Sequence, residues 1–402
     1  MQRRTFLRHA AALTALGAAP LRAARGPAPR IGVIGGGIVG SSIAWHLASA
    51  GARVTLFEKA QPASGATRNS FAWLNAFVDD PAYRELRLAS LADWHTLDRS
   101  LRLGILWGGY ASWASAPADL KLLRESIAQM RSSRFPVKPI GTAQLQALAP
   151  GIITGEVQEA FYSSADGHLD PVAVTQRFVS EARRLGAQVR LDTEVIGLDL
   201  ASGELRGVQT PAGPVSLDRV VIASGVDTPR LTGMAGFALR LKHQPGILAH
   251  SVPVKRLTRA IFDAPGTLSI KQMADGSIVG TDSPHPPDIP AHREILDHAV
   301  PFPSAELAAM HGNRILGKIG AVLPGARGLA LERLTLGFRP MPIDELPVVG
   351  LVPGMSDVYV AVTHSGVTLA PILGRHVTHE ILRSERVAAL APFRPERFQE
   401  KT

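Results

Sequence analysis

The stretch of sequence that decides the fold is RIGVIGGGIVG, residues 30–40. Its first five residues have the apolar character of a buried parallel strand, and glycines 35, 37 and 40 follow with the spacing G-x-G-x-x-G. Apolar residues then recur at helical spacing until Gly51, and RVTLFE at 53–58 alternates as a second strand does. This order predicts a strand, a tight turn, a helix and a second strand, which is the unit that binds the pyrophosphate of a dinucleotide.

The three glycines and the acid that follows them have separate physical roles. Gly35 permits the turn, Gly37 lets the backbone approach a pyrophosphate, and Gly40 lets the helix pack against the strand. The helix N-terminus offers free N–H groups to the anion. Glu58 lies 18 residues after Gly40, where a carboxylate accepts hydrogen bonds from both ribose hydroxyls and repels a 2′-phosphate. An NADP-type ligand is therefore disfavoured, and a purely structural glycine turn is the alternative.

The residues after Glu58 favour FAD over NAD. Residues 60–70 form a loop of small side chains with no third strand, whereas an NAD domain continues into another helix and strand. The run 31–75 resembles the FAD-binding opening of the D-amino-acid oxidase superfamily, which includes glycine oxidase, sarcosine oxidase and related amine dehydrogenases. The resemblance implies that the loop at 65–68 wraps the diphosphate and ribityl chain of FAD.

Two motifs near the C-terminus carry the same resemblance. GFRPMPIDELPVVG at 337–350 matches the superfamily's Gly-Phe-Arg-Pro pattern, and VYVAVTHSGVTLAP at 358–371 matches its closing strand, glycine turn and helix. A strand is expected at 359–362 and a helix at 368–382, whose N-terminus can stabilise the anion of a reduced flavin. Over roughly residues 30–385 the resemblance implies an α/β fold, with a Rossmann-type FAD-binding domain and an interleaved antiparallel-sheet α+β substrate domain.

Segments of these two domains are expected to alternate along the chain. The expected order is an export signal (1–26), a first FAD-binding segment (27–80), a mainly substrate-domain segment (81–150), a mainly FAD-binding second segment (151–235), another substrate-domain segment (236–331) and a third FAD-binding segment (332–390). The hydrophobic pattern predicts helices at 81–101, 117–130 and 171–185, and strands at 104–110, 186–191, 193–198, 219–226, 247–251, 260–262, 268–271 and 277–280.

The first 26 residues are typical of an export signal. Arg3 and Arg4 precede Thr-Phe-Leu, which resembles the twin-arginine signal, and a short apolar stretch at 10–21 leads into small residues. This stretch is too short to cross a bilayer, which takes roughly 20 residues. We therefore expect a periplasmic protein without an integral membrane span, and a frayed amphipathic helix is the alternative.

Composition and charge narrow the class of protein. A chain of 402 residues with 46% apolar and 19% charged residues predicts two or three compact domains. The formal charge is +9, but five arginines precede residue 27, so the rest of the chain carries only +4 and nucleic acid is not an expected partner. The absence of cysteine excludes disulfides, thiolate catalysis and a thioether-linked cofactor. Histidines 285, 292, 298 and 311 lack metal-ligand spacing, so we expect no metal.

The motifs and the resemblance together nominate the residues that contact FAD. In the superfamily the position of Val195 binds the adenine end through its backbone, and the strand at 219–226 lies next to the flavin. The expected contacts are Gly35, Gly37, Ile38, Val39, Gly40, Glu58, Lys59, Gly65, Ala66, Thr67, Arg68, Val195, Ser224, Gly225, Arg339, His364, Ser365, Gly366, Val367 and Thr368. Cysteine is absent and no histidine lies between Gly51 and Trp73, so we expect FAD to be bound non-covalently.

Three side chains are candidates for catalysis. In the amino-acid oxidases of the superfamily, the arginine that matches Arg339 holds the substrate carboxylate; the alternatives here are an ion pair with Asp344 or Glu332, or support of the flavin ring. His364 is a candidate base, although its place in the flavin turn favours cofactor contact. Lys271 lies on an expected strand of the substrate sheet and can poise a water for oxygen or proton chemistry, with an exposed lysine as the alternative.

The resemblance implies an FAD-dependent oxidoreductase that dehydrogenates the C–N bond of an amino acid or N-substituted amino acid by hydride transfer to flavin. The substrate is a small molecule, and the electron acceptor is either oxygen or a membrane quinone or other redox partner. Two alternatives stay open. The first is oxidation of a 2-hydroxy acid or polyol on the same fold, and the second is a non-catalytic flavin-binding partner.

Overall fold

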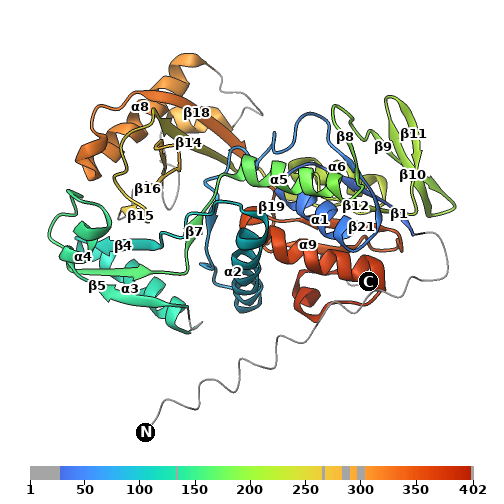
Figure 1. Ribbon diagram of the computed structural model, residues 1–402, viewed down its shortest axis with the longest axis horizontal. Helices are drawn as coiled ribbons and strands as arrows, with labels where there is room; N and C mark the ends of the chain where they lie inside the picture. Colours follow the sequence, from blue (N-terminus) through green and yellow to red (C-terminus); the bar gives the residue numbers. More distant parts are fainter. Residues whose placement is uncertain (1–27, 133–134, 265–267, 283–289, 297–303, 400–402) are drawn as a thin grey trace, which may run out of the picture.

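The computed structural model describes residues 28–399, except 133–134, 265–267, 283–289 and 297–303. The expected export signal and its twin arginines therefore lie outside the described residues, as do His285 and His298. Two large sheets form the centres of two lobes, one on each side of Figure 1.

A six-stranded sheet forms the centre of the lobe that contains the glycine-rich turn. Its strands run in the spatial order β20-β21-β12-β1-β2-β8, and all are parallel except β20, which is antiparallel to β21. Their bounds are β1 (Arg30–Ile34), β2 (Arg53–Phe57), β8 (Gln188–Arg190), β12 (Arg219–Ile222), β20 (Val348–Leu351) and β21 (Val358–Val362). Strands that are far apart in the sequence thus meet in one parallel sheet, as the strand–turn–helix–strand pattern predicts.

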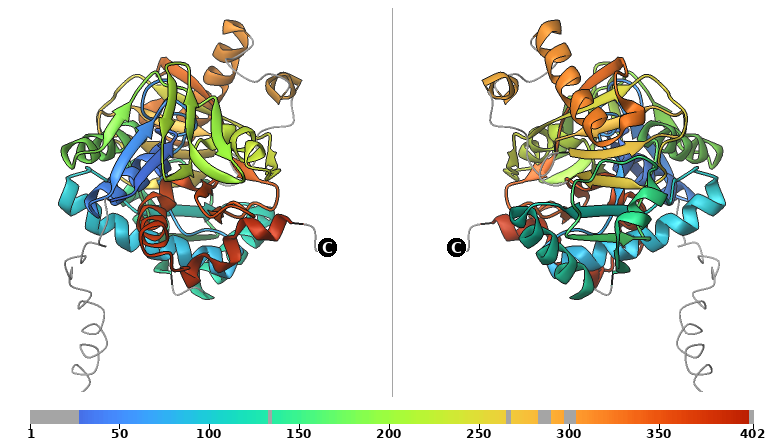
Figure 2. Two further views of the ribbon diagram at one scale, coloured as in Figure 1. Left: turned by 90° about the vertical axis from the view of Figure 1, so that its right-hand side faces the viewer. Right: turned by 90° about the vertical axis from the view of Figure 1, so that its left-hand side faces the viewer.

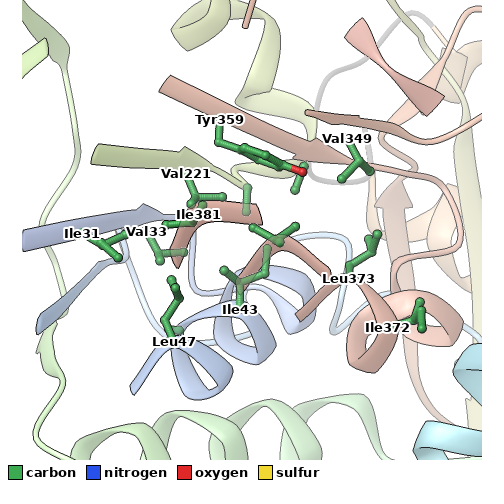
Figure 3. Close-up of a cluster of buried hydrophobic side chains, with 14 of the residues drawn as sticks. Ile31, Val33, Ile43, Leu47, Val221, Val349, Tyr359, Ile372, Leu373 and Ile381 are labelled. Atoms are coloured by element: carbon green, nitrogen blue, oxygen red, sulfur yellow. The ribbon is translucent and has the colours of Figure 1, made fainter. Parts of the chain in front are cut away.

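Helices α1 (Ile38–Ser49) and α9 (Gly366–Arg383) cover one face of this sheet. Since successive side chains of a strand point to opposite faces, only alternate residues of each strand meet these helices. Ile31 and Val33 of β1 are among them, and they join side chains from both helices in one buried cluster (Figure 3). Helix α5 (Pro171–Arg184) packs beside α1 and begins at the predicted residue, where Asp170 caps it and Pro171 takes the first helical position.

Helix α6 (Thr228–Met234) and a small antiparallel sheet cover the opposite face. Ile34, Val220 and Ile222 point from the strands of the six-stranded sheet into this second core. The small sheet faces the viewer in the left view of Figure 2 and consists of β9 (Gly197–Ala201), β10 (Glu204–Thr210) and β11 (Gly213–Ser216). The six-stranded sheet is therefore buried on both faces, which leaves its edges and strand ends for binding.

An eight-stranded sheet forms the centre of the second lobe. Its spatial order is β18-β14-β17-β16-β15-β4-β6-β5, and only the β15–β4 pair is parallel. The bounds are β4 (Tyr110–Ala114), β5 (Val137–Ile140), β6 (Glu159–Ser163), β14 (Pro245–Ser251), β15 (Ile261–Ala264), β16 (Leu268–Gln272), β17 (Ile278–Thr281) and β18 (Leu331–Phe338). Helix α8 (Ala305–Val322) packs on one face of this sheet.

Two of these strands fall outside the segments expected for the substrate domain. β6 lies within 151–235 and all but the first residue of β18 lies within 332–390, yet β6 pairs with β4 and β5, and β18 pairs with β14. Hydrogen-bonded partners decide which sheet a strand joins, and those partners are distant in the sequence. The sheet therefore combines residues 110–163 with residues 245–338.

Helix α2 (Pro81–Leu101) lies between the two lobes (Figure 1). Its start is set by Asp80, whose carboxylate accepts a hydrogen bond from the Tyr83 N–H at 2.7 Å, and by Pro81 at the first helical position. Its buried side chains join a cluster that also contains residues of β4, β6 and α9. Although 81–150 is the segment expected to be mainly substrate domain, α2 packs against α9 of the FAD-binding lobe.

The remaining elements are short or lie at the periphery. They are β3 (Trp73–Leu74), α3 (Pro117–Ser132), α4 (Thr142–Leu148), β7 (Gly167–His168), β13 (Leu241–Lys242), α7 (Pro290–Leu296) and β19 (Met341–Pro342). Within the described residues of the chain, no helix combines the length and the apolar character that a membrane span requires.

Two predicted strands are displaced in the structure. The strand predicted at 104–110 begins only at Tyr110, because Gly104 and Gly109 adopt positive φ angles of 69° and 76° that interrupt an extended chain. The strand predicted at 193–198 begins at Gly197. The residues before it instead cross the end of β2, where the Thr193 N–H donates to the Glu58 carbonyl at 2.9 Å.

Candidate cofactor and substrate site

The main cavity lies at the carboxyl ends of β1, β2, β12 and β21. This edge of a parallel sheet is where such folds bind their ligands. Its lining includes Glu58 after β2, Val195, and Gly366 at the start of α9.

The glycine-rich turn forms one wall of this cavity. Gly35 has φ of 108°, and a Cβ atom there would lie 2.5 Å from the Ala223 carbonyl oxygen. A Cβ on Gly40 would lie 2.0 Å from the Gly35 oxygen, so both positions require glycine. A Cβ on Gly37 would meet only the Thr67 hydroxyl, at 3.3 Å. Backbone at Gly37 therefore faces open space at the N-terminus of α1, as the approach of a pyrophosphate requires.

Glu58 follows β2 and is anchored by the backbone. It is 7% exposed, its Oε2 accepts a hydrogen bond from the Gly36 N–H at 2.7 Å, and its Oε1 accepts one from the Ala60 N–H at 2.9 Å. Each carboxylate oxygen has a second acceptor site free for a ribose hydroxyl. The arrangement fits the predicted role of Glu58 and adds a second one, since the same carboxylate holds the glycine-rich turn against the loop at 60.

The loop at 64–67 and the start of α9 also line the cavity. Thr67 Oγ1 accepts a hydrogen bond from the Ile38 N–H at 3.1 Å, which ties this loop to the N-terminus of α1. Helix α9 begins at Gly366, two residues before the predicted start, so its positive end borders the cavity directly. Two helix N-termini thus converge on a cavity suited to an anionic ligand.

The structure brings most of the predicted cofactor residues to the cavity. Those that line it are Gly35, Gly37, Ile38, Val39, Glu58, Lys59, Gly65, Ala66, Thr67, Val195, Ser224, Gly225, His364, Gly366 and Val367. The predicted residues that do not line it are Gly40, Arg68, Arg339, Ser365 and Thr368. Gly40 acts instead through helix packing, because of the close approach of the Gly35 carbonyl described above.

The sequence analysis did not predict several of the residues that line the cavity. They are Phe57, Ser64, Ser70, Thr193, Glu194, Ala223, Val226, Asp227, Arg230, Pro340, Ala361, Val362 and Thr363, together with Ile34. Most are immediate neighbours of predicted residues, so proximity to the motifs could have found them. Thr193 and Arg230 carry no motif of their own, and only the tertiary structure places them at the cavity.

Arg230 closes the end of the cavity where Val195 lies. Its Nη2 donates to the Val195 carbonyl at 3.0 Å and to Asp227 at 2.7 Å. It also lies 3.5 Å from a carboxylate oxygen of Glu194. Because the Val195 carbonyl already accepts a hydrogen bond from Arg230, an adenine bound there would share this acceptor or use the Val195 N–H.

Arg339 has no acidic partner within ion-pair distance among the residues that the structure describes. The predicted alternative partner Asp344 instead pairs with Arg397 at 2.7 Å. The guanidinium lies beside β14, where a Cβ on Gly246 would come within 3.3 Å of its Nη2. Burial lowers the pKa of Arg339 below its ordinary value, yet the group stays charged. A half-buried guanidinium without a carboxylate partner is a ready site for a ligand carboxylate.

His364 lines the cavity next to this region. Although the His364 ring is exposed to the cavity, desolvation by the surrounding protein and the positive charges of Arg339 and Arg87 lower the pKa of His364 to about 3. The ring is therefore neutral at physiological pH, and its Nδ1 lies 3.4 Å from the Ser365 hydroxyl. A neutral imidazole in this position is suited to a hydrogen bond with cofactor or substrate and is unsuited to the role of proton donor.

Lys271 is buried, contrary to the alternative of an exposed lysine. It is 2% exposed, and its Nζ lies 5.1 Å from the centre of the Phe71 ring. Burial lowers its pKa to about 7. His168 is 1% exposed, and among the described residues neither of its ring nitrogens has a hydrogen-bond partner. His168 and His250 are further buried bases whose pKa values are lowered by burial and by neighbouring positive charges that include Lys271. All five residues of β16 are buried, and Lys271 lies on the face opposite to Leu268 and Ile270, a direction that no motif signals.

The described residues contain no group of three or more histidine, cysteine, aspartate or glutamate side chains arranged to hold a metal ion. The cavity instead offers backbone N–H groups, hydroxyls and the anchored carboxylate of Glu58. These are the partners of a pyrophosphate and a ribose. The residues present therefore fit FAD.

Comparison with known proteins gives the same assignment. The family described as "FAD dependent oxidoreductase" (DAO) matches residues 30–380. The chain is 27% identical to one subunit of the opine oxidase of Agrobacterium tumefaciens, over 91% of this chain and 96% of that protein. It is 24% identical to human mitochondrial dimethylglycine dehydrogenase over 91% of this chain, but it spans only 44% of that protein.

The fold is shared with solved structures. The crystal structure of glycine oxidase from Geobacillus kaustophilus superposes with a TM-score of 0.81 at 23% identity and covers 92% of this chain and 100% of that one. The family match extends over most of the chain and includes both lobes and the whole cavity. The chain therefore belongs to the DAO family of FAD-dependent oxidoreductases, and its cofactor is FAD.

Proposed function

We propose that this oxidoreductase dehydrogenates the C–N bond of an amino acid or N-substituted amino acid. The observation that carries the proposal is the Arg339 guanidinium, which is half-buried and has no carboxylate partner in the described structure. Its neighbour Pro340 lines the cavity together with His364. A substrate carboxylate held by Arg339 would place the adjacent α carbon toward this end of the cavity.

The side chains around this position suit a neutral amine substrate. His364 is uncharged at physiological pH, so its ring can form a hydrogen bond with a neutral amine, and the positive charge of Arg339 disfavours a protonated amine. FAD, when bound, supplies the hydride acceptor. The substrate loses a hydride from its α carbon and a proton from its nitrogen, and the resulting imine is hydrolysed by water to an amine and a carbonyl compound. The chain itself contributes orientation, charge complementarity and exclusion of competing geometries.

The names of the relatives support an amino-acid or amine substrate. Glycine oxidase, dimethylglycine dehydrogenase and opine oxidase each act on a compound with a C–N bond next to a carboxylate. A 2-hydroxy acid would also fit an arginine, because the same carboxylate is present. Amine oxidation and hydroxy-acid oxidation are therefore distinguished by which compound reduces the flavin.

Anaerobic reduction of the bound flavin tests the proposal directly. Purified holoenzyme is mixed without air with glycine, sarcosine, dimethylglycine, both enantiomers of proline, glycolate, lactate and glycerol, and bleaching of the flavin absorbance is followed. We expect bleaching by one or more of the amino acids and none by glycerol. Bleaching by hydroxy acids alone would replace amine oxidation by hydroxy-acid oxidation, and a flavin that no compound reduces would favour a non-catalytic partner.

We also propose that FAD is bound non-covalently and that the electrons pass to oxygen or to a membrane quinone. The lack of cysteine in the sequence supports the first point. Heat denaturation followed by filtration should release all of the FAD, whereas flavin retained on the protein would show a covalent bond. Reoxidation of the reduced enzyme by air and by a soluble quinone, measured in parallel, identifies the acceptor by rate.

Finally, we propose that the chain is exported to the periplasm by the twin-arginine route. The sequence at Arg3 and Arg4 supports this proposal. The double change Arg3→Lys with Arg4→Lys preserves charge but alters the signal pattern. It should leave the protein in the cytoplasm, and normal appearance in the periplasmic fraction would contradict the assignment.

A further inference from the structure

Helix α2 lies along the first turn of α9, which borders the cofactor cavity. The Tyr83 hydroxyl lies 3.4 Å from Thr363 Oγ1, and the Ser90 hydroxyl donates to the Thr368 carbonyl at 2.6 Å. Tyr83, Arg87 and Ser90 are separated by four and three residues, so they share one face of α2. Arg87 therefore lies between two residues whose side chains contact the start of α9.

The Arg87 guanidinium is fixed in place by neutral acceptors. The residue is 6% exposed. Its Nε donates to the Asn75 carbonyl at 3.1 Å, its Nη1 to the Phe77 carbonyl at 3.1 Å, and its Nη2 to Asn75 Oδ1 at 2.7 Å. The guanidinium also lies 5.5 Å from the centre of the Tyr83 ring. These contacts engage all three nitrogens of the guanidinium without neutralising its charge.

No carboxylate of the described chain forms an ion pair with Arg87. The acid that interacts with it electrostatically is Asp166, whose own pKa burial raises to about 7. Asp166 is engaged by the Trp73 indole and the Ser163 hydroxyl instead. At neutral pH this acid carries only a fraction of a negative charge, so most of the charge on Arg87 remains uncompensated.

This uncompensated cation lies at the end of α9 where a cation is least favourable. The N-terminus of a helix carries partial positive charge, which repels a nearby guanidinium and attracts an anion. The charge of Arg87 is also felt by the cavity residue His364, whose protonation it opposes. A buried cation at a helix N-terminus is costly unless an anionic group occupies the neighbouring cavity.

We propose that Arg87 is a positioning residue for the redox chemistry of the bound FAD. Its fixed positive charge, held behind the Thr363–Thr368 turn, favours negative charge on the flavin and so raises the reduction potential of FAD. Arg87 acts through the field at the start of α9 and through the segment 75–77 that it holds. The inference rests on the FAD cofactor and is independent of which substrate is oxidised.

Removal of the charge should lower the midpoint potential of the bound FAD. The holoenzyme is titrated without air against a reference dye in wild type and in Arg87→Met. We expect the affinity ratio for reduced over oxidised FAD to fall at least tenfold, which corresponds to about 30 mV or more for a two-electron couple. Arg87→Lys keeps the charge and should retain most of the wild-type potential.

A second variant neutralises the same charge without removing the arginine. Asn75→Asp places a carboxylate at the atom that already accepts from Arg87 Nη2. Asn75→Asp should also lower the midpoint potential of the bound FAD, and it should preserve the hydrogen bonds of the guanidinium. This variant tests the proposal even if Arg87→Met does not fold.

The matched control is Arg84→Met on the same helix. Arg84 donates to the Val78 carbonyl at 2.9 Å and to the Asp79 carbonyl at 2.8 Å, so it makes the same type of contact one turn before Arg87 on α2. It should leave the potential unchanged. An unchanged potential in FAD-loaded Arg87→Met or in Asn75→Asp would overturn the proposal, and so would an equal shift in Arg84→Met, since the effect would then belong to the helix as a whole.

Discussion

The two large sheets present their functional groups in different ways. At the edge of the six-stranded sheet the cavity is lined mainly by backbone and small side chains, and Glu58 is held by two backbone N–H groups. The eight-stranded sheet instead buries the long basic side chain of Lys271, whose charge acts on His168 of β7, and among the described residues the ring nitrogens of His168 have no hydrogen-bond partner. In the first region backbone groups stay available to a ligand. In the second region the burial of basic groups costs folding free energy.

A site made of backbone groups and a site made of buried charged side chains should therefore respond differently to substitution. A site built from turns loses its shape when a glycine or an anchoring acceptor changes. A site built from buried charges loses its function, yet gains stability, when a charge is removed.

Arg339→Met should have the largest effect, on substrate binding. Removing one partner of a desolvated charge pair costs about 2–5 kcal/mol, so half-saturation for the best amino-acid substrate should rise by orders of magnitude while FAD stays bound. The measurement is anaerobic flavin reduction at several substrate concentrations. The amide of the same substrate, which has no carboxylate, should respond little to the change. Equal half-saturation in wild type and variant would remove Arg339 from the substrate site.

Lys271→Met should stabilise the protein at neutral pH. The folded pKa of about 7 lies far below the ordinary value of 10.5, so the unfolded chain binds a proton between these pH values that the folded chain does not. Stability of the wild type therefore rises with pH across this window. Methionine removes the buried charge, and the gain should be about 2–4 kcal/mol at pH 7 and shrink toward pH 10.

Urea unfolding at pH 7 and near pH 10 measures this difference. Lys138→Met is the matched control, because Lys138 lies 5.5 Å from the Tyr162 ring but is exposed. The control should show no comparable gain. A loss of stability in Lys271→Met at pH 7 would mean that the ammonium is compensated, and the contrast between the two sheets would not hold.

Glu58→Gln should weaken FAD binding and loosen the glycine-rich turn together. A glutamine offers only one acceptor oxygen, whereas Glu58 accepts from both Gly36 and Ala60. The expected loss in FAD affinity is about 1–3 kcal/mol, measured by the return of flavin fluorescence on dilution. Glu204→Gln, on an exposed strand of the small sheet, is the control. Unchanged FAD occupancy on dilution would contradict the ribose assignment.

Trp94→Phe should have the smallest effect, which falls on the packing of α2 against α9. Pro371 has no N–H, so the Val367 carbonyl lacks its donor within the helix, and the Trp94 indole supplies one at 3.1 Å. Phenylalanine removes this donor, which should cost about 0.5–1.5 kcal/mol of unfolding free energy, the net contribution of a typical hydrogen bond. Trp45→Phe on α1 serves for comparison in the same urea titration. Equal losses in both would assign the effect to ring volume alone.

Much of the cofactor half could be predicted because its determinants are local. Gly35 must adopt a positive φ and Gly40 must accept a close carbonyl, and both requirements are met within one strand–turn–helix unit. The acid at position 58 follows from the length of the intervening helix and strand. Arg230 could not be foreseen in the same way, since its contact with Val195 joins residues from separate elements.

The sequence by itself determined the cofactor class, the α/β fold and the position of the glycine-rich turn, because spacing along a single strand–turn–helix unit fixes backbone geometry. Only the tertiary structure decided that Lys271 is buried, that Arg339 lacks an acidic partner among the described residues and that Arg87 lies at the start of α9. These properties depend on strand register and helix packing between residues far apart in the chain. A one-residue change in register reverses the direction of a strand's side chains, and no local motif records it.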